Sequence, residues 1–334
     1  MTLAVAIVAL AGSLVFLARA VRSEDAPARA AVAELPAASA TGGQDEATPT
    51  RAPSPPRPTA APARTVPART APAGADATPG LPPREDAALV AAVEEALKPF
   101  EGVYSVAVYR LSDGKAAAIE PDRVFYAASL FKLAVLYEAG LRLDSGDLDL
   151  EAALAINDID IAEDDGTFDS VPRRNDGSIS VAMALEAMVT VSDTTTANAF
   201  LHLFGHATID ATMHSLGLQH TSVNTRELPT TASDMAILMT AIYNGRGLTP
   251  ATRDYLRSLL LAQHLREGIP AGLPGGVAVG NKTGNVADDT HDVAFVEAPG
   301  GAYVLAVLSD RSWNWSAHVA VSEAVYRALA APVR

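Results

Sequence analysis

Apolar side chains divide much of the chain into segments of two kinds. In the first kind, apolar and polar residues alternate or apolar residues run together, which is typical of strands. The predicted strands cover residues 104–109, 116–119, 277–283, 292–297 and 303–308. In the second kind, apolar residues recur at helical spacing. The predicted helices cover residues 129–143, 180–190, 194–204, 208–216, 232–244, 250–263 and 317–330.

Turn sequences connect two of the strand pairs. Ser112-Asp-Gly-Lys115 separates the first two strands and Pro299-Gly-Gly301 separates the last two, as expected of hairpins. Because strands stand at both ends of this region and helices lie between them, we expect one five-stranded antiparallel sheet, built from both termini, with a helical insertion. The predicted fold class is therefore α/β, and more narrowly α+β.

The beginning of the chain is apolar from Leu3 to Ala18. This run is short for a membrane span but suits a secretory signal, so residues 1–22 are predicted to be a signal peptide or an N-terminal membrane anchor. Arg19 and Arg22 follow the run instead of preceding it, which argues against export by the positive-inside rule. The apolar run still predicts an extracytoplasmic protein, either secreted or membrane-anchored through residues 3–18.

A Pro-rich segment separates this beginning from the rest of the chain. Residues 23–84 are rich in Ala, Pro, Thr and Arg, and 11 of the 22 prolines lie between Pro49 and Pro83. Such a composition cannot bury enough apolar surface to offset its conformational entropy. We therefore expect residues 23–84 to be a disordered linker and residues 85–334 to be the folded domain.

The predicted domain is acidic. It holds 33 Asp and Glu residues against 17 Lys and Arg residues, a net charge of −16. Proteins that bind nucleic acids usually carry clustered basic residues, so nucleic acid is not an expected partner. The chain contains no cysteine, which excludes disulfides and thiol chemistry.

One lysine interrupts the most apolar of the predicted helices. From Leu130 to Leu136 every residue except Lys132 is apolar. A helix that is apolar on all faces is usually buried, and lysine is rarely buried unless it is paired. Ser129 precedes Lys132 by three residues, so the two side chains share a helix face. A desolvated lysine holds its proton less firmly, so the pattern indicates a serine nucleophile activated by Lys132. The alternative is an N-cap serine and a lysine that extends to solvent.

Two further motifs follow in order along the chain. Ser192-Asp193-Thr194 begins a predicted helix, and Lys282-Thr283-Gly284 ends a predicted strand. With "FYAASLFK", "VTVSDTTTAN" and "NKTGN", the chain resembles the penicillin-recognising active-site serine enzymes, and class A β-lactamases most closely. Their signature is Ser-x-x-Lys, Ser-Asp-Asn and Lys-Thr-Gly. The resemblance extends from about Tyr104 to the last helix and implies a β-lactamase/transpeptidase-like fold.

The resemblance implies a role for each matched residue. Ser129 would be the nucleophile, Lys132 its activating partner, and Ser192 the group that relays a proton to the leaving nitrogen. The backbone N–H groups of Ser129 and Asn285 would form the oxyanion hole. The residues implied in substrate binding are Lys282 and Thr283, which would hold a carboxylate, together with Thr194 and Gly284.

Two departures from the family pattern affect the expected activity. Thr194 stands where the family has an asparagine, and its hydroxyl has a shorter reach than an amide. Class A β-lactamases also carry, on a long loop, a glutamate that activates the water for deacylation. The corresponding segment here is short, and Glu227 is its single acid. Glu227 could replace the missing base or be a solvated partner of Arg226.

Several functions agree with these features. The first is an active-site serine hydrolase that acts on β-lactams through an acyl-serine intermediate and deacylates slowly. The second is a D,D-peptidase acting on peptidoglycan peptides, and the third is a non-catalytic cell-envelope binding or β-lactam-sensing module. His202 and His206 have the spacing of metal ligands, but Gly205 is expected to end the helix between them. We expect no metal, no other cofactor and a monomer.

Overall fold

The computed structural model describes residues 84–161 and 166–330. The predicted signal or anchor over residues 1–22, and the predicted linker up to residue 83, lie outside the described residues. No helix within the described ranges is both long and apolar enough to span a bilayer.

A six-stranded sheet forms the centre of the described part of the chain. Its strands are β1 (Arg84–Glu85), β2 (Tyr104–Arg110), β3 (Lys115–Ile119), β6 (Ala278–Asn285), β7 (Thr290–Ala298) and β8 (Gly301–Ser309). They lie in the order β1-β3-β2-β8-β7-β6. All neighbours are antiparallel except β1, which pairs in parallel with β3. The predicted fold is confirmed, because strands from both ends of the domain form one sheet.

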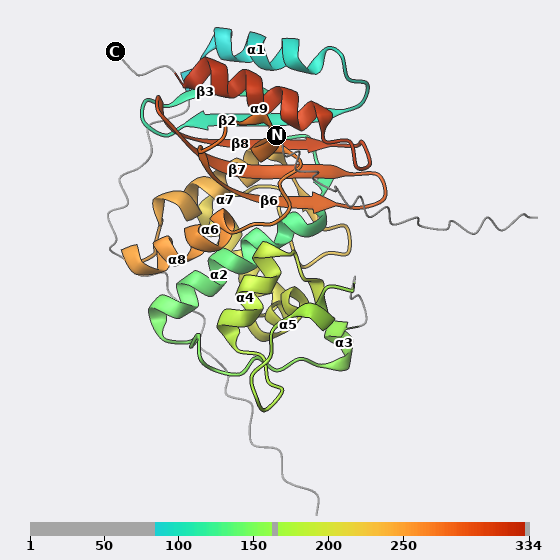
Figure 1. The fold of residues 1–334 in the computed structure, drawn as a ribbon, viewed down its shortest axis with the longest axis vertical. Coiled ribbons are helices and arrows are strands. Elements are labelled where there is room, and N and C mark those ends of the chain that lie inside the picture. Colours follow the sequence, from blue (N-terminus) through green and yellow to red (C-terminus); the bar gives the residue numbers. More distant parts are fainter. Residues whose placement is uncertain (1–83, 162–165, 331–334) are drawn as a thin grey trace, which may run out of the picture. The chain divides into compact units, whose positions relative to one another are not determined.

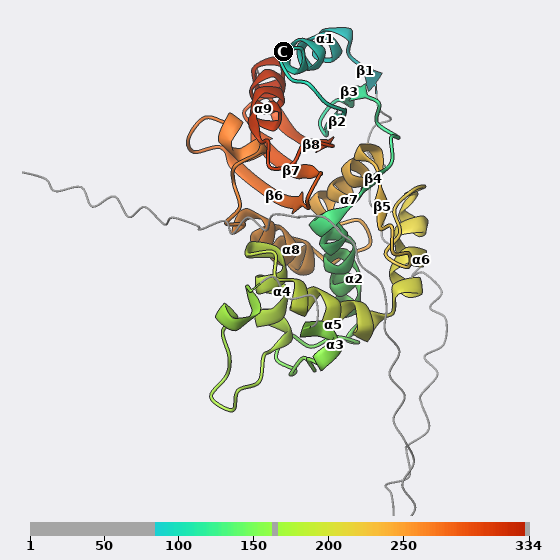
Figure 2. The same ribbon diagram turned by 90° about the vertical axis from the view of Figure 1, so that its right-hand side faces the viewer.

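Helices cover both faces of this sheet (Figure 1; Figure 2). On one face lie α1 (Ala87–Leu97) and α9 (Ser316–Leu329). On the other face lies the helical insertion, which consists of α2 (Phe131–Ser145), α3 (Asp158–Ile161), α4 (Val181–Thr190), α5 (Thr194–Phe204), α6 (His206–Leu216), α7 (Ala232–Asn244) and α8 (Pro250–Leu261). Short elements connect them: β4 (Phe125–Tyr126), η1 (Ala128–Leu130), η2 (Phe168–Ser170), β5 (Pro229–Thr230) and η3 (Ile269–Gly272).

Two elements at the beginning of the domain were not predicted. Asp86 precedes helix α1 and caps it, because its carboxylate accepts hydrogen bonds from Ala88 N and Leu89 N, each over 3.1 Å. Its Leu89 and Val93 are buried in the cluster between the sheet and α9. Strand β1 includes Arg84, the last residue of the predicted linker, and adds a sixth strand to the predicted five.

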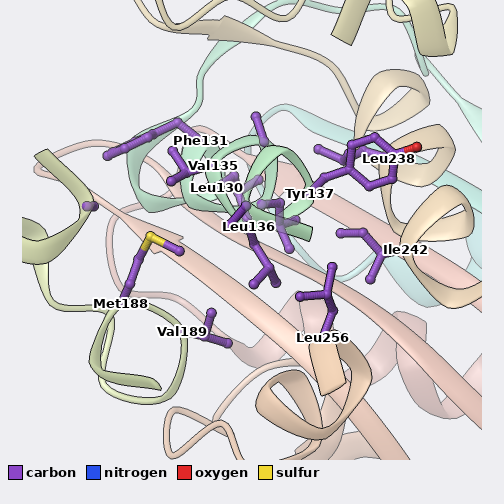
Figure 3. Packing of buried hydrophobic residues seen from close by; sticks show 14 of the residues in the cluster. Leu130, Phe131, Val135, Leu136, Tyr137, Met188, Val189, Leu238, Ile242 and Leu256 are labelled. Atoms are coloured by element: carbon purple, nitrogen blue, oxygen red, sulfur yellow. The ribbon is translucent and has the colours of Figure 1, made fainter. Parts of the chain in front are cut away.

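Helix α2 is the central helix of the insertion. Its residues from Phe131 to Gly140 are all buried, as its apolar sequence predicts. Figure 3 shows Leu136 and its neighbours facing side chains of three other helices, among them Met188 of α4, Ile242 of α7 and Leu256 of α8. Deletion of a well-packed leucine in such a core typically costs about 2–5 kcal/mol. Close packing on several sides makes α2 a rigid support for the residues at its beginning.

Candidate active site

The nucleophile predicted from sequence lies in a tight turn before the central helix. Ser129 belongs to η1, which runs directly into α2. The residues before Ser129 are held by the segment around Pro229. Strand β4 pairs with β5, and Ala127 N donates to Leu228 O over 2.7 Å. Ala128 takes a left-handed φ of 44°, which is costly for a residue with a side chain. This constrained turn leaves Ser129 half-buried at the beginning of a buried helix.

Lys132 is directed toward a group of oxygen atoms. The residue is 1% exposed. Its Nζ lies 3.0 Å from Ser129 Oγ, 3.2 Å from Ser192 Oγ and 3.1 Å from Thr194 Oγ1. It also donates to the carbonyl oxygen of Ser192. The buried lysine is therefore paired with polar groups of η1 and of the turn before α5.

This geometry suits a proton acceptor. An ammonium has three N–H donors, and at least four oxygens lie within hydrogen-bond distance of Lys132 Nζ. A neutral amine has two donors and one lone pair. In that form Nζ can donate to two of these oxygens and accept the hydrogen bond of the Ser129 hydroxyl. The site can therefore hold the amine and Ser129 in the orientation needed for proton transfer.

Ser192 lies in a second strained turn, between α4 and α5. Its φ is 64°, in the left-handed region, and the residue is buried. The next residue, Asp193, caps α5 by accepting from Thr196 N over 2.7 Å. Its other carboxylate oxygen accepts from Thr167 Oγ1 over 2.7 Å. The cap and the Thr167 contact fix the turn, so that the side chain and the carbonyl of Ser192 both reach Lys132.

Lys282 approaches Ser192 from the sheet. It is fully buried on β6, and its Nζ donates to Ser192 Oγ over 2.8 Å and to the Thr283 carbonyl oxygen over 2.9 Å. Ser192 Oγ therefore lies between two amines, Lys132 and Lys282. Thus the three motifs meet at one place, although about 150 residues separate the first from the last.

The end of β6 is packed against the turn that carries Ser129. A Cβ atom added to Gly284 would lie 2.9 Å from Ala127 O and 3.2 Å from Leu130 N, closer than carbon atoms normally approach backbone groups. Glycine is therefore required for this contact. The next residue, Asn285, is half-buried at the end of β6. The contact places the backbone of Asn285 beside the turn that carries Ser129.

Glu227 lies near this turn but is exposed. It precedes Leu228, whose carbonyl holds Ala127. Within residues 84–161 and 166–330, the Glu227 carboxylate makes no hydrogen bond or ion pair. The loop around it is nevertheless well anchored, since Asp234 accepts from Gln219 N, His220 N and Thr221 N at 2.8–3.0 Å. The structure thus brings together the side chains of Ser129, Lys132, Ser192, Thr194 and Lys282, but not that of Glu227.

Comparison with known proteins identifies the family. The family model described as the β-lactamase enzyme family matches residues 88–330. The chain belongs to the β-lactamase enzyme family. Its family and fold identify this β-lactamase-like protein as a serine hydrolase. No curated protein sequence matches the chain significantly.

Several solved structures are similar to this β-lactamase-like protein. PBP-A is 26% identical, with a TM-score of 0.68, and the match covers 74% of this chain and 97% of PBP-A. A mutant of PBP-A, described as an acyl-enzyme complex with penicillin G, is 26% identical over 74% of this chain and 98% of its own, with a TM-score of 0.67. An ancestral class A β-lactamase is 26% identical over 71% and 97% of the two chains, with a TM-score of 0.64.

Two buried polar residues beside the motifs of this β-lactamase-like protein were not identified from the sequence. Asp292 is fully buried on β7 and accepts hydrogen bonds from Asn281 and Ile269. His291 precedes it; its Nε2 contacts Tyr126 O over 2.9 Å, and its Nδ1 accepts from Ser309 N over 3.2 Å. Burial lowers the pKa of His291 to about 4, so the ring is neutral near pH 7. The available signal was a polar run, Thr290 to Asp292, at the start of an apolar strand.

Proposed function

We propose that β-lactams acylate this protein at Ser129 and that the acyl group is released slowly. The observation that supports the proposal best is the position of Lys132 Nζ, which lies within hydrogen-bond distance of the hydroxyls of both Ser129 and Ser192. The acyl-enzyme complex of the PBP-A mutant with penicillin G is consistent with this activity.

In the proposed acylation, the Ser129 hydroxyl gives its proton to neutral Lys132 while its oxygen forms a bond to the lactam carbonyl carbon. The backbone N–H groups of Ser129 and Asn285 stabilise the negative oxygen that results. The C–N bond then breaks, and Ser192 gives its proton to the nitrogen. Lys132 restores the proton of Ser192 across 3.2 Å. The proton of Ser129 thus ends on the leaving nitrogen, and both Lys132 and Ser192 return to their starting states.

Substrate binding is assigned to the end of β6 and the turn before α5. Lys282 and Thr283 hold the substrate carboxylate through charge-assisted hydrogen bonds, while Gly284 lets the strand pack closely against the turn that carries Ser129. The proposed role of Thr194 differs from that of the family asparagine, because the Thr194 hydroxyl lies 3.1 Å from Lys132 Nζ. We propose that Thr194 orients Lys132 and contributes less to holding the substrate amide.

The proposed slow deacylation follows from the position of Glu227. Hydrolysis of the acyl-enzyme needs a base that activates a water molecule, and loss of such a base typically costs about 10²–10⁴ in rate. The exposed Glu227 carboxylate has no contact with Ser129 or Lys132. The same observation favours a second function, a penicillin-binding D,D-peptidase that acts on peptidoglycan peptides. The third candidate is a non-catalytic cell-envelope binding or β-lactam-sensing module. A sensor that acylates slowly would be labelled at Ser129, whereas a module that has lost its reactivity would not.

The experiment is intact-mass analysis after incubation with penicillin G, followed by nitrocefin kinetics. We expect one penicilloyl adduct in the wild type, none in Ser129→Ala, and a burst of nitrocefin hydrolysis followed by slow turnover. Glu227→Gln should leave the slow phase unchanged, because the carboxylate it replaces has no contact at the site. An unlabelled wild type would refute the proposal. Fast turnover that Glu227→Gln abolishes would instead identify an efficient β-lactamase with Glu227 as its base.

We also propose that residues 1–22 direct this domain out of the cytoplasm and that residues 23–83 link it to that segment. The apolar run and the Pro-rich composition support this arrangement. Cell fractionation of the full chain and of a form lacking residues 1–22 tests it. Equal cytoplasmic retention of both forms would contradict it.

A further inference from the structure

Asp292 lies directly behind the strand assigned to the substrate carboxylate. It is paired with Thr283 in the β6–β7 register, and cross-strand partners project to the same face of a sheet. Asn281 Nδ2 donates to Asp292 Oδ1 over 2.9 Å, and Ile269 N donates to Asp292 Oδ2 over 2.8 Å. A Cβ atom on Gly268 would lie only 2.6 Å from Asp292 Oδ2. The carboxylate is therefore enclosed by β6, β7 and the loop before η3.

Among the described residues, the positive charge of Lys282 acts on Asp292 and lowers its pKa. His318 of α9 and His291 of β7 are both buried, and burial lowers their pKa values to about 3 and about 4, so both are neutral at working pH. Strand β8 contains no charged residue. In the loop before η3, Arg266 donates to the carbonyl oxygens of Gln263 and Val279, and Glu267 is exposed.

Two effects on the ionisation of Asp292 oppose each other. Burial favours the neutral carboxylic acid, whereas the donors Asn281 and Ile269 and the positive charge of Lys282 favour the carboxylate. Burial is the larger effect and raises the pKa of Asp292 to about 7. The side chain thus changes its charge within the ordinary working range of an enzyme.

We propose that Asp292 is a positioning residue that sets how strongly Lys282 and Thr283 hold a substrate carboxylate. The inference rests on the proposed function, in which those two residues bind that group. Ionised Asp292 offsets the charge of Lys282 and repels the substrate carboxylate, whereas neutral Asp292 leaves the full charge of Lys282 available. Binding of anionic substrates therefore weakens as the pH rises through 7, and neutral analogues are not affected.

The experiment separates binding from chemistry. Stopped-flow acylation gives the dissociation constant of the non-covalent complex and the acylation rate for penicillin G and for its neutral methyl ester, between pH 5.5 and 8.5. For the wild type, we expect the dissociation constant of penicillin G to rise about tenfold over this range. This is the effect expected when Asp292 gains one negative charge whose field is partly screened. The constant of the ester should stay within twofold.

Two variants complete the test. Asp292→Asn is uncharged at every pH, and it should bind penicillin G with a pH-independent constant close to that of the wild type at pH 5.5. Asp288→Asn removes an exposed charge from the same hairpin. Its dissociation constant for penicillin G should show the same pH dependence as that of the wild type. A pH dependence that is unchanged in Asp292→Asn would overturn the inference. If Asp292→Asn does not fold, the wild type alone decides: dissociation constants of penicillin G and of its methyl ester that change equally with pH would overturn the inference.

The same data distinguish this inference from the proposed function. If mass analysis shows no adduct on Ser129 with either ligand at any pH, the proposed function is wrong and the inference fails with it. If the adduct forms but the dissociation constant of penicillin G does not change with pH, the inference alone is wrong.

Discussion

Replacement of Gly284 by alanine should damage acylation far more than folding. The added Cβ would lie 2.9 Å from Ala127 O, 3.2 Å from Leu130 N and 3.1 Å from Leu130 Cγ. Two of these three neighbours are backbone atoms of the turn that carries Ser129, and backbone atoms cannot rotate away. An ordinary contact begins near 3.4 Å, so β6 and η1 must separate by about half an ångström.

The expected effects of Gly284→Ala on the acylation rate and on stability follow from the groups on the two sides of the contact between β6 and η1. Ser129 belongs to the turn and Asn285 to the strand, and their N–H groups are the proposed oxyanion hole. Displacement of one donor typically lowers an acylation rate by about 10²–10³, and misplacement by 1 Å costs about 10². We expect Gly284→Ala to acylate roughly 10²-fold more slowly. Overpacking of this kind should reduce the free energy of unfolding by only about 1–3 kcal/mol.

The assay is the second-order rate constant of labelling by a fluorescent penicillin, measured together with urea unfolding. Gly275→Ala is the matched control, because no heavy atom lies within 4 Å of its added Cβ and it lies in the connection before the same strand. Labelling of Gly284→Ala within about twofold of Gly275→Ala would show that the contact between β6 and η1 does not shape the oxyanion hole.

Two further variants test the buried ionisable residues Lys132 and Asp292. Lys132→Met should lower Ser129 labelling by about 10²–10⁴, the usual effect of a lost base, and labelling at the wild-type rate would contradict the assignment of the base. Urea unfolding should show a loss of about 1–3 kcal/mol, because methionine fills the space but leaves the Ser192 carbonyl and the Thr194 hydroxyl without the hydrogen bonds of Nζ. Asp292 has a folded pKa of about 7 against an ordinary 3.8, so its contribution to stability is complete below pH 4 and declines as the pH rises to 7, by about 4 kcal/mol. Asp292→Asn should flatten this decline in urea unfolding, and an identical slope in both proteins would contradict it.

The sequence was most informative where local pattern and burial coincide. The apolar run from Leu130 to Leu136 predicted a buried helix, and α2 is buried as expected. Alternating residues after Tyr104 predicted β2 and the hairpin to β3, and both are present. Helix α1 was missed because its Ala-rich sequence buries only Leu89 and Val93, which leaves a weak periodicity beside a Pro-rich segment.

The site was predictable as a set of motifs but not as an arrangement. Order along the chain indicated that Ser129, Ser192 and Lys282 belong together. In the structure Lys282 Nζ contacts Ser192 Oγ, and Lys132 Nζ connects Ser192 to Ser129, while the roles of these residues stay a prediction. Asp292 gave no comparable signal, since an acid at the start of a strand is usually exposed. It is buried where a loop distant in sequence, at Gly268 and Ile269, closes over its carboxylate.

The pairing of β2 with β8 has a consequence for how the domain is made. Tyr104 pairs with Ser309, a sequence separation of roughly 200 residues, so the contact order of the central strands is high and folding is expected to be slow. During synthesis β2 presents an unpaired edge until β8 has left the ribosome, and such edges are prone to aggregation and to capture by chaperones. Loss of β8 and α9 from a shortened chain would therefore remove the middle of the sheet and prevent the whole domain from folding.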